Sequence, residues 1–215
     1  MDAAKSSARN RSMNQIGTSF FTDYSKRLQA ILTHADWSNV EKLAIDMKKC
    51  WTHKRQIFIC GNGGSAGNAI HLANDYLYGV AKGSGVGIRI HALSSNPAIL
   101  TCLSNDIGYE RIFSEQLAVY GQASDLLIVL SGSGNSANIV NVLEQAHQMH
   151  IKSYAILGFT GGLCKELADV AIHFSVDDMQ IAEDLQLIVG HMLMQWLYAN
   201  RPSTQKQENK EVSYA

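Results

Sequence analysis

The sequence predicts an α/β domain with a doubly wound, five-stranded parallel sheet flanked by helices. From residue 56 onwards, short apolar runs alternate with helical stretches, an order that is typical of α/β proteins. The runs are almost continuous in Ile, Val and Leu, which indicates strands buried on both faces, as in a parallel sheet. A chain of 215 residues is long enough for one sizeable domain and marginal for two.

Two helices are expected before the sheet, between Ser19 and Trp51, with a break near the sequence THADWSN. Ser38 followed by Glu41 fits a capping box that opens the second helix. The apolar face of that helix is expected to consist of Val40, Leu43, Ile45 and Met47.

Five strands and five further helices are expected in alternation. The strands are predicted at residues 56–60, 87–93, 125–131, 153–159 and 170–176. The helices are predicted at residues 65–78, 109–119, 137–149, 161–168 and 180–198. The polar ends, 1–16 and 201–215, are expected to be flexible tails, which leaves 17–200 as a single domain.

Composition and charge argue against several classes of protein. The net charge is −1, which offers no electrostatic footprint for nucleic acid or for an acidic membrane surface. No apolar run approaches the roughly 20 residues that span a bilayer. The first 17 residues contain no apolar signal core, so we expect a cytoplasmic protein. The four cysteines form no CxxC pair, so we expect buried free thiols. They are Cys50, Cys60, Cys102 and Cys164.

Two glycine- and serine-rich loops are expected at the carboxyl ends of strands, where ligands sit in doubly wound sheets. They are CGNGGS, residues 60–65, and LSGSGNSAN, residues 130–138. Glycine lets the backbone approach a ligand closely, and the N–H groups of a helix N-terminus attract phosphate. Ser131, Ser133 and Ser136 add hydroxyl groups. Neither loop is a P-loop or a good G-x-G-x-x-G match. We favour a site for a small phosphomonoester over the alternative, which is that these residues only make tight turns.

A second group of residues suggests acid–base or metal chemistry. His71 and Asp75 are four apart on the helix that follows the first loop, so they share a face. Glu183 and His191 lie on the last helix, eight residues and therefore about 12 Å apart. Two histidines and two carboxylates suit zinc or proton transfer next to a carbonyl. At about 12 Å apart, both residues cannot reach one ion from within the helix. Either Glu183 precedes the regular helix or the two residues serve sites in different subunits. A structural role is expected for His53, His91, His147, His150 and His173.

Four segments together resemble the phosphoheptose isomerases, a family of sugar-isomerase (SIS) domain proteins. They are CGNGGSAGNAIHLAND, LSNDIGYERIFSEQL, LIVLSGSGNSANIV and AEDLQLIVGH. The resemblance implies an SIS-type fold whose N-terminal helices pack in a homotetramer, with zinc-containing sites built between subunits. It also implies conversion of sedoheptulose 7-phosphate into an aldoheptose 7-phosphate, the first step towards the heptose units of bacterial surface polysaccharides.

The resemblance also implies roles for individual residues. A carboxylate on the first helix after the sheet begins acts as the base and the histidine of the last helix acts as the acid, through a cis-enediol; the candidates for this catalysis are Asp75, Glu183 and His191. The implied zinc ligands are His71, Asp75, Glu183 and His191. The implied substrate contacts are Asn62, Gly63, Gly64, Ser65, Asp75, Asn105, Asp106, Ser131, Gly132, Ser133, Ser136 and Glu183.

The sequence departs from the family pattern at several of these positions. Asp75 replaces the usual glutamate and Glu183 replaces the usual glutamine, so either carboxylate can be the base. Gly132 replaces a threonine in the phosphate loop, and Lys82 is the nearest cation where an arginine is expected. Two other functions therefore stay open, a non-catalytic protein that binds phosphosugars as a regulator or assembly partner, and an isomerase of a different phosphosugar.

Overall fold

The computed structural model of the chain describes residues 17–82 and 85–202. The predicted tails, 1–16 and all but the first two residues of 201–215, lie outside the described residues. The elements in chain order are α2 (Ser19–His34), α3 (Ser38–Thr52), β1 (Gln56–Gly61), α4 (Gly63–Leu77), η1 (Gly79–Ala81), β2 (Arg89–Ala92), α5 (Pro97–Asp106), η2 (Tyr109–Arg111), α6 (Ser114–Tyr120), β3 (Leu126–Ser131), α7 (Ala137–Gln148), β4 (Lys152–Leu157), α8 (Cys164–Leu167), β5 (Val170–His173) and α9 (Met179–Ala199).

The sheet confirms the predicted fold class. Its five strands run parallel in the order β2-β1-β3-β4-β5. The chain moves from β1 outwards to β2 and then returns to the other side of β1 as β3, so the strand order reverses between these two strands. Gly61, the last residue of β1, is in register with Leu130 near the end of β3. Both glycine-rich loops therefore leave the same edge of the sheet at the reversal point, where doubly wound sheets bind ligands.

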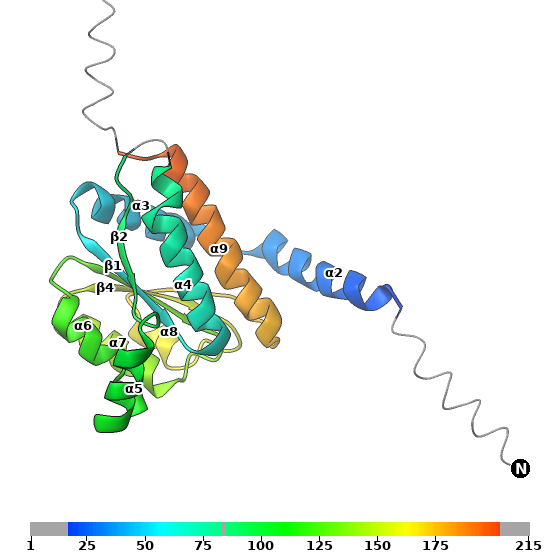
Figure 1. Cartoon of the computed structure of the whole chain (residues 1–215). Coiled ribbons are helices and arrows are strands. Elements are labelled where there is room, and N and C mark those ends of the chain that lie inside the picture. The colour runs from blue at the N-terminus through cyan, green and yellow to red at the C-terminus, as the bar shows by residue number, and fades with distance from the viewer. Residues whose placement is uncertain (1–16, 83–84, 203–215) are drawn as a thin grey trace, which may run out of the picture. The chain divides into compact units, whose positions relative to one another are not determined.

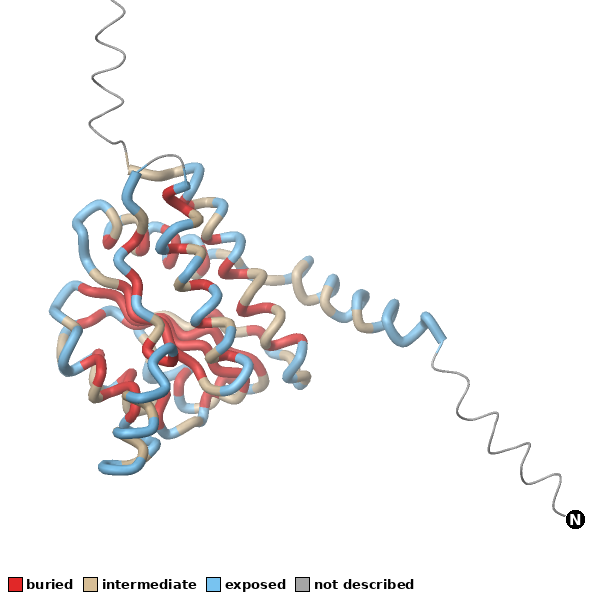
Figure 2. Tube along the Cα trace, viewed as in Figure 1, coloured by how far each residue is buried: buried red, intermediate tan, exposed pale blue. Residues whose placement is uncertain are grey.

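Helices cover both faces of the sheet, as Figure 1 shows. Helices α3, α4 and α9 pack on one face, and α6, α7 and α8 pack on the other. The three central strands, β1, β3 and β4, are buried almost throughout, and they form the centre of the tube in Figure 2. The edge strands β2 and β5 are more exposed. Alternate residues of β1 serve the two faces, because Phe58 and Cys60 belong to the core cluster under α7, while Ile57 and Ile59 are buried as well. Burial on both sides explains the continuous apolar runs of the sequence.

Helix α2 forms a separate unit of the chain, which divides at Asp36. It is 16 residues long and none of its residues is buried. Whether α2 belongs to the single domain predicted for residues 17–200 therefore stays a prediction. Packing of the N-terminal helices in an oligomer stays a prediction for the same reason.

Helix α3 differs from its prediction in two details. It begins at Ser38, with Trp37 at the N-cap and no hydrogen bond from the cap side chain. The capping box placed Ser38 at the N-cap, which is one residue later than the N-cap in the structure. Val40, Leu43 and Met47 are buried, but Ile45 is 41% exposed, because it lies off the 3.6-residue stripe that the other three share.

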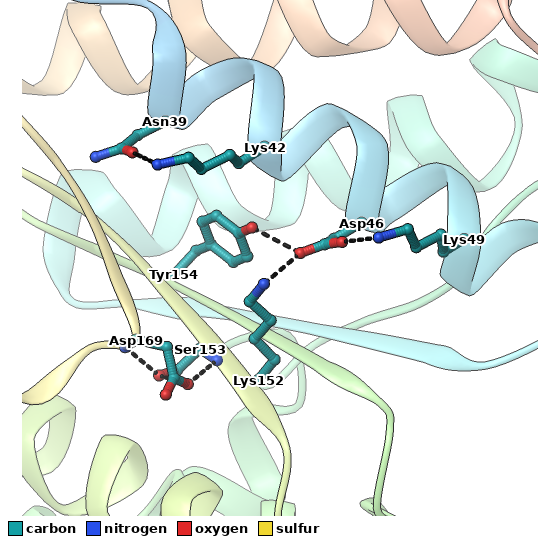
Figure 3. Close-up of polar contacts among 8 residues, drawn as sticks. All are labelled: Asn39, Lys42, Asp46, Lys49, Lys152, Ser153, Tyr154 and Asp169. Atoms are coloured by element: carbon teal, nitrogen blue, oxygen red, sulfur yellow. Dashed lines mark hydrogen bonds and ion pairs between the residues drawn. The ribbon is translucent and has the colours of Figure 1, made fainter.

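A polar cluster attaches α3 to the sheet (Figure 3). The Asp46 carboxylate accepts hydrogen bonds from Lys49 Nζ at 2.9 Å, Lys152 Nζ at 2.7 Å and Tyr154 Oη at 2.8 Å. Burial alone would raise the pKa of Asp46, but these three donors and the positive charge of Lys152 lower it to about 2. The cluster thus fixes α3 against β4.

The segment between β2 and β3 was only partly predicted. Helix α5 was not expected, although Asn96 caps it by accepting hydrogen bonds from two first-turn N–H groups and Pro97 occupies its first position, both standard start signals. The predicted helix over 109–119 is instead a 3₁₀ turn followed by α6. The predicted helix over 161–168 is only four residues long in α8.

The cysteine prediction is correct for three residues and wrong for one. Cys50, Cys60 and Cys164 are free and buried, whereas Cys102 is free and exposed on α5. A hydrogen bond from its thiol to Asp106, together with the carboxylate charge, raises the pKa of Cys102. None of the helices in the described part of the chain is both long enough and apolar enough to cross a membrane.

Candidate active site

The first loop joins β1 to α4 with little room for side chains. Asn62 occupies the N-cap position, and Gly63 has a positive φ of 54°, which glycine adopts without strain. A Cβ on Gly61 would lie 2.7 Å from the Cβ of Ser65, so only glycine fits there. The loop therefore presents backbone N–H groups at the start of a 15-residue helix, an arrangement that attracts anions.

The second loop, between β3 and α7, is held in shape by its own side chains. Ser131 is buried and its Oγ accepts a hydrogen bond from Gly134 N at 3.0 Å. Asn135 Oδ1 accepts a hydrogen bond from Leu163 N at 3.0 Å. Ser133 and Ser136 are partly exposed, and Ser136 occupies the N-cap position of α7 without making a side-chain cap bond. Two of the three predicted hydroxyls therefore remain accessible, beside a helix N-terminus.

Gly132 in this loop lies beside the start of α9. A Cβ at this position would lie 2.6 Å from Met179 Sδ and 3.2 Å from its Cε. Met179 is the first residue of α9. A side chain at this position would thus meet the flexible end of Met179, which is 39% exposed and can move aside.

A pair of asparagines joins the two loops. Asn62 Nδ2 donates to Asn138 Oδ1, and Asn138 Nδ2 donates to Asn62 Oδ1, both at 2.8 Å. Tyr109 Oη also donates to Asn62 Oδ1, at 2.9 Å. Asn138 is 2% exposed in the first turn of α7. The Asn62 side chain, a predicted substrate contact, is thus already engaged and sets the spacing between the loops.

Asn105 and Asp106 lie at the C-terminal end of α5 and are exposed. Their side chains hydrogen-bond to each other, with Asn105 Nδ2 2.8 Å from Asp106 Oδ1. Tyr109, three residues later, reaches the first loop through Asn62. This segment therefore borders the loops, although the described contacts of Asn105 and Asp106 lie within α5.

The structure brings three of the four predicted metal ligands together. His71 Nε2 lies 3.0 Å from His191 Nε2 and 3.4 Å from Asp75 Oδ2, and His191 Nε2 lies 3.6 Å from Asp75 Oδ2. Tetrahedral zinc ligands at their usual bond lengths lie about 3.4 Å from one another, so the donor atoms and their spacing fit that ion. The side chains of the two histidines are about half exposed, which leaves a fourth position open towards solvent. Among the described residues, these three form the group that can hold a metal ion.

Glu183 lies apart from this group within one chain. It follows Met179 inside the regular helix α9, so the explanation that Glu183 precedes the helix is wrong. A Cβ on Gly64 would lie 2.5 Å from the Cδ of Glu183, which places the carboxylate against the first turn of α4. Gly64 is seven residues before His71, a rise of about 10 Å. The Glu183 carboxylate is therefore close to the first loop and not to the metal group. That Glu183 and His191 serve sites in different subunits stays a prediction.

The hydroxyl of Ser65 is engaged by α9. Ser65 is 5% exposed, and its Oγ accepts a hydrogen bond from Gln186 Nε2 at 3.0 Å. Gln186 itself is 1% exposed on α9. The hydroxyl of Ser65 thus contributes to the packing of α4 on α9, and only its backbone N–H is left for the substrate contact that was predicted.

Sequence reasoning missed the residues that support the site rather than form it. Asn138, Tyr109, Tyr76 and Gln186 each make a hydrogen bond to another part of the site or its helices. Asn138 lies within the quoted second loop, so its place was visible but its partner was not. Tyr76 and Gln186 each lie on the buried, mainly apolar face of their helix. A polar group on such a face is the sequence signal that could have indicated a buried hydrogen bond.

Comparison with known proteins agrees with this geometry. Residues 19–158 match the model of the SIS domain family. A phosphoheptose isomerase of Akkermansia muciniphila is 38% identical over 158 residues, which cover 74% of this chain and 82% of the relative. The chain belongs to the phosphoheptose isomerase family of SIS-domain proteins.

Other members of the family support the same relationship. A phosphoheptose isomerase of Helicobacter pylori is 37% identical over 138 residues, covering 64% of this chain and 71% of the relative. The solved structure of a phosphoheptose isomerase from Francisella tularensis superposes with a TM-score of 0.80 at 25% identity and covers 87% of this chain and 98% of that one. The Neisseria gonorrhoeae family member gives a TM-score of 0.74 at 26% identity over 83% of this chain and 94% of that one.

Proposed function

We propose that this protein is a ketose–aldose isomerase that converts sedoheptulose 7-phosphate into an aldoheptose 7-phosphate for the heptose units of bacterial surface polysaccharides. The observation that carries the proposal is the His71–Asp75–His191 group, whose spacing fits a metal ion. Two of its members lie on α4, the helix that begins at the first anion loop, and His191 lies on α9. Relatives named phosphoheptose isomerase supply the substrate class. A cytoplasmic location follows from the same metabolic role.

The two loops bind the phosphate end of the substrate in this proposal. The backbone N–H groups at the starts of α4 and α7 and the accessible hydroxyls of Ser133 and Ser136 supply neutral donors. Neutral donors suit a small phosphomonoester, because they bind its charge without attracting larger polyanions. Asn62 and Asn138 hold these two groups of donors at a fixed separation.

Proton transfer between C1 and C2 requires one base and one acid. A carboxylate, Asp75 or Glu183, takes the proton from C1 of the ketose and returns it to C2, while His191 gives a proton to the C2 oxygen and takes one from the C1 oxygen. In this structure Asp75 Oδ2 faces both histidines, whereas no hydrogen bond or ion pair of the Glu183 carboxylate is found among the described residues.

Zinc is the metal proposed for the site, where it would polarise the substrate carbonyl. His71, Asp75 and His191 would hold it in one chain. His191 turns the same Nε2 atom towards both partners, so while that atom binds a metal it cannot also donate a proton. The two roles of His191 therefore exclude each other at a given step, and the dependence of turnover on metal distinguishes them.

A second subunit would supply Glu183 in the proposed homotetramer. Support comes from the distance of Glu183 from the metal group and from exposed apolar residues beside that group on α4 and α9, which are Ile70, Leu77 and Met192. Such residues are typical of a surface covered by a partner.

The testing experiment is an isomerisation assay on sedoheptulose 7-phosphate with zinc supplied and with chelator. Wild type, Asp75→Asn, Glu183→Gln and His191→Ala are compared, and Glu183→Gln subunits are also mixed with His191→Ala subunits. Turnover by wild type that each substitution lowers by at least about 100-fold, with part of it restored in the mixture, supports the proposal and shared sites. Stabilisation of wild type by the sugar phosphate without turnover would refute the enzyme and favour a binding protein.

A further inference from the structure

The three residues of the metal group come from two helices, so their spacing depends on how α9 lies against α4. His71 and Asp75 belong to α4 and His191 belongs to α9. The side chains of the two histidines are about half exposed, so contacts with neighbouring side chains do little to fix them. Sliding one helix by a single residue would move His191 by about 1.5 Å, whereas metal–ligand distances tolerate only about 0.2 Å.

One fixed point lies directly beside the metal group. Tyr76 Oη donates a hydrogen bond to Gly190 O at 2.9 Å, and Tyr76 is 1% exposed. Tyr76 follows Asp75 in the chain, and Gly190 precedes His191. This single bond therefore links the two backbone segments that carry the ligands.

The same place sets the distance between the helices. A Cβ on Gly190 would lie 2.7 Å from Leu72 Cδ1 and 3.0 Å from its Cγ. Leu72 is one turn before Tyr76 on the same face of α4. The absence of a side chain at Gly190 thus lets the helices approach closely enough for His71 and His191 to meet.

A second fixed point lies one turn earlier on α9, at Gln186. Gln186 Nε2 donates to Ser65 Oγ, and Gln186 Oε1 accepts from Asn68 Nδ2, both at 3.0 Å. Asn68 Nδ2 also donates to Glu183 O at 3.0 Å. Buried hydrogen bonds add to the packing of the two helices a penalty for any other register, because their polar groups would be left unpaired.

From these hydrogen bonds between α4 and α9 we infer that Tyr76 and Gln186 are positioning residues. They hold α9 in the register that brings His191 to the two ligands on α4. The inference rests on the proposed function only through its metal site. Neither side chain touches the substrate or the ion. Both act on the metal group by fixing the helices that carry it.

Tyr76→Phe tests the first fixed point, because it removes one hydroxyl and leaves the ring. Tyr154→Phe is the matched control, since it also removes a buried tyrosine hydroxyl with one hydrogen-bond partner, Asp46, and that bond joins β4 to α3. The probe is Co²⁺, titrated by its visible absorption, alongside urea unfolding. We expect Tyr76→Phe to weaken Co²⁺ binding about tenfold, in the range for residues that orient ligands. Tyr154→Phe should lose similar stability and keep its Co²⁺ affinity.

Gln186→Met tests the second fixed point, with Gln116→Met as its control. Gln116 is also buried and its Nε2 donates to two backbone carbonyls on the other side of the sheet. Weaker Co²⁺ binding only in the Gln186 variant would support the inference. Equal Co²⁺ affinities within each matched pair would overturn it. Wild type that binds no Co²⁺ would refute the metal site and the inference together, whereas wild type that binds Co²⁺ but does not turn over substrate would refute only the proposed function.

Discussion

Replacing Asp46 by asparagine removes the charge at the centre of the polar cluster that attaches α3 to the sheet (Figure 3). The pKa of this carboxylate falls from 3.8 to about 2 in the folded protein. That difference is equivalent to at most about 2.5 kcal/mol of stability. Its two lysine partners are 65% and 49% exposed, so solvent screens the pairs. We therefore expect Asp46→Asn to cost about 1 kcal/mol at pH 7, measured by urea unfolding.

The sign of the pH dependence follows from the direction of the pKa change. Because the folded state lowers the pKa of Asp46, its contribution to stability is fully present above pH 4 and is lost as the pH falls towards 2. About half of it should remain at pH 3. The difference in unfolding free energy between wild type and Asp46→Asn should therefore shrink between pH 5 and pH 3.

A control carboxylate separates this effect from a general change of charge. Asp177 is exposed in the same unit of the chain as Asp46, and Asp177→Asn should change stability by less than about 0.5 kcal/mol at any of these pH values. A cost of Asp46→Asn that is the same at pH 7 and pH 3, or that matches the control, would refute the reasoning.

Three further predictions concern the loops and α5. Gly132→Thr should lower the free energy of unfolding by at most about 1 kcal/mol, because its Cβ meets only the exposed, flexible end of Met179, and adding Met179→Ala should restore most of the loss in urea unfolding. Asn138→Leu should lower the free energy of unfolding by about 2 kcal/mol, since it removes both hydrogen bonds between Asn138 and Asn62. Calorimetric titration should also show weaker binding of sedoheptulose 7-phosphate, and unchanged binding would contradict the role of the pair. Cys102 should be the one cysteine of the described chain that reacts quickly with a thiol reagent in the native protein, and Asp106→Asn should speed this reaction at pH 8, because the Asp106 carboxylate raises the pKa of the thiol.

The strands and their order of appearance were predictable because burial on both faces leaves a mark in the sequence. A strand such as β3, in which all six residues are buried, requires an unbroken apolar run. The loops were predictable for a related reason, since a backbone that turns sharply at Gly63 and Gly134 with positive φ requires glycine. Helix α5 escaped prediction because its apolar residues are only partly buried, which weakens the periodic pattern on which prediction depends.

The sequence by itself determined the residue types of the site, namely two histidines, two carboxylates and two loops that suit an anion. It also limited which of them can meet on one helix, because helical rise is fixed, and so it separated Glu183 from His191. Only the tertiary structure decided that His191 joins His71 and Asp75, 120 and 116 residues away in the chain respectively. That choice depends on the register of α9 on α4, which Tyr76, Gly190 and Gln186 set. Hydrogen bonds across a helix interface depend on packing geometry, and packing geometry leaves no periodic signal in a single sequence.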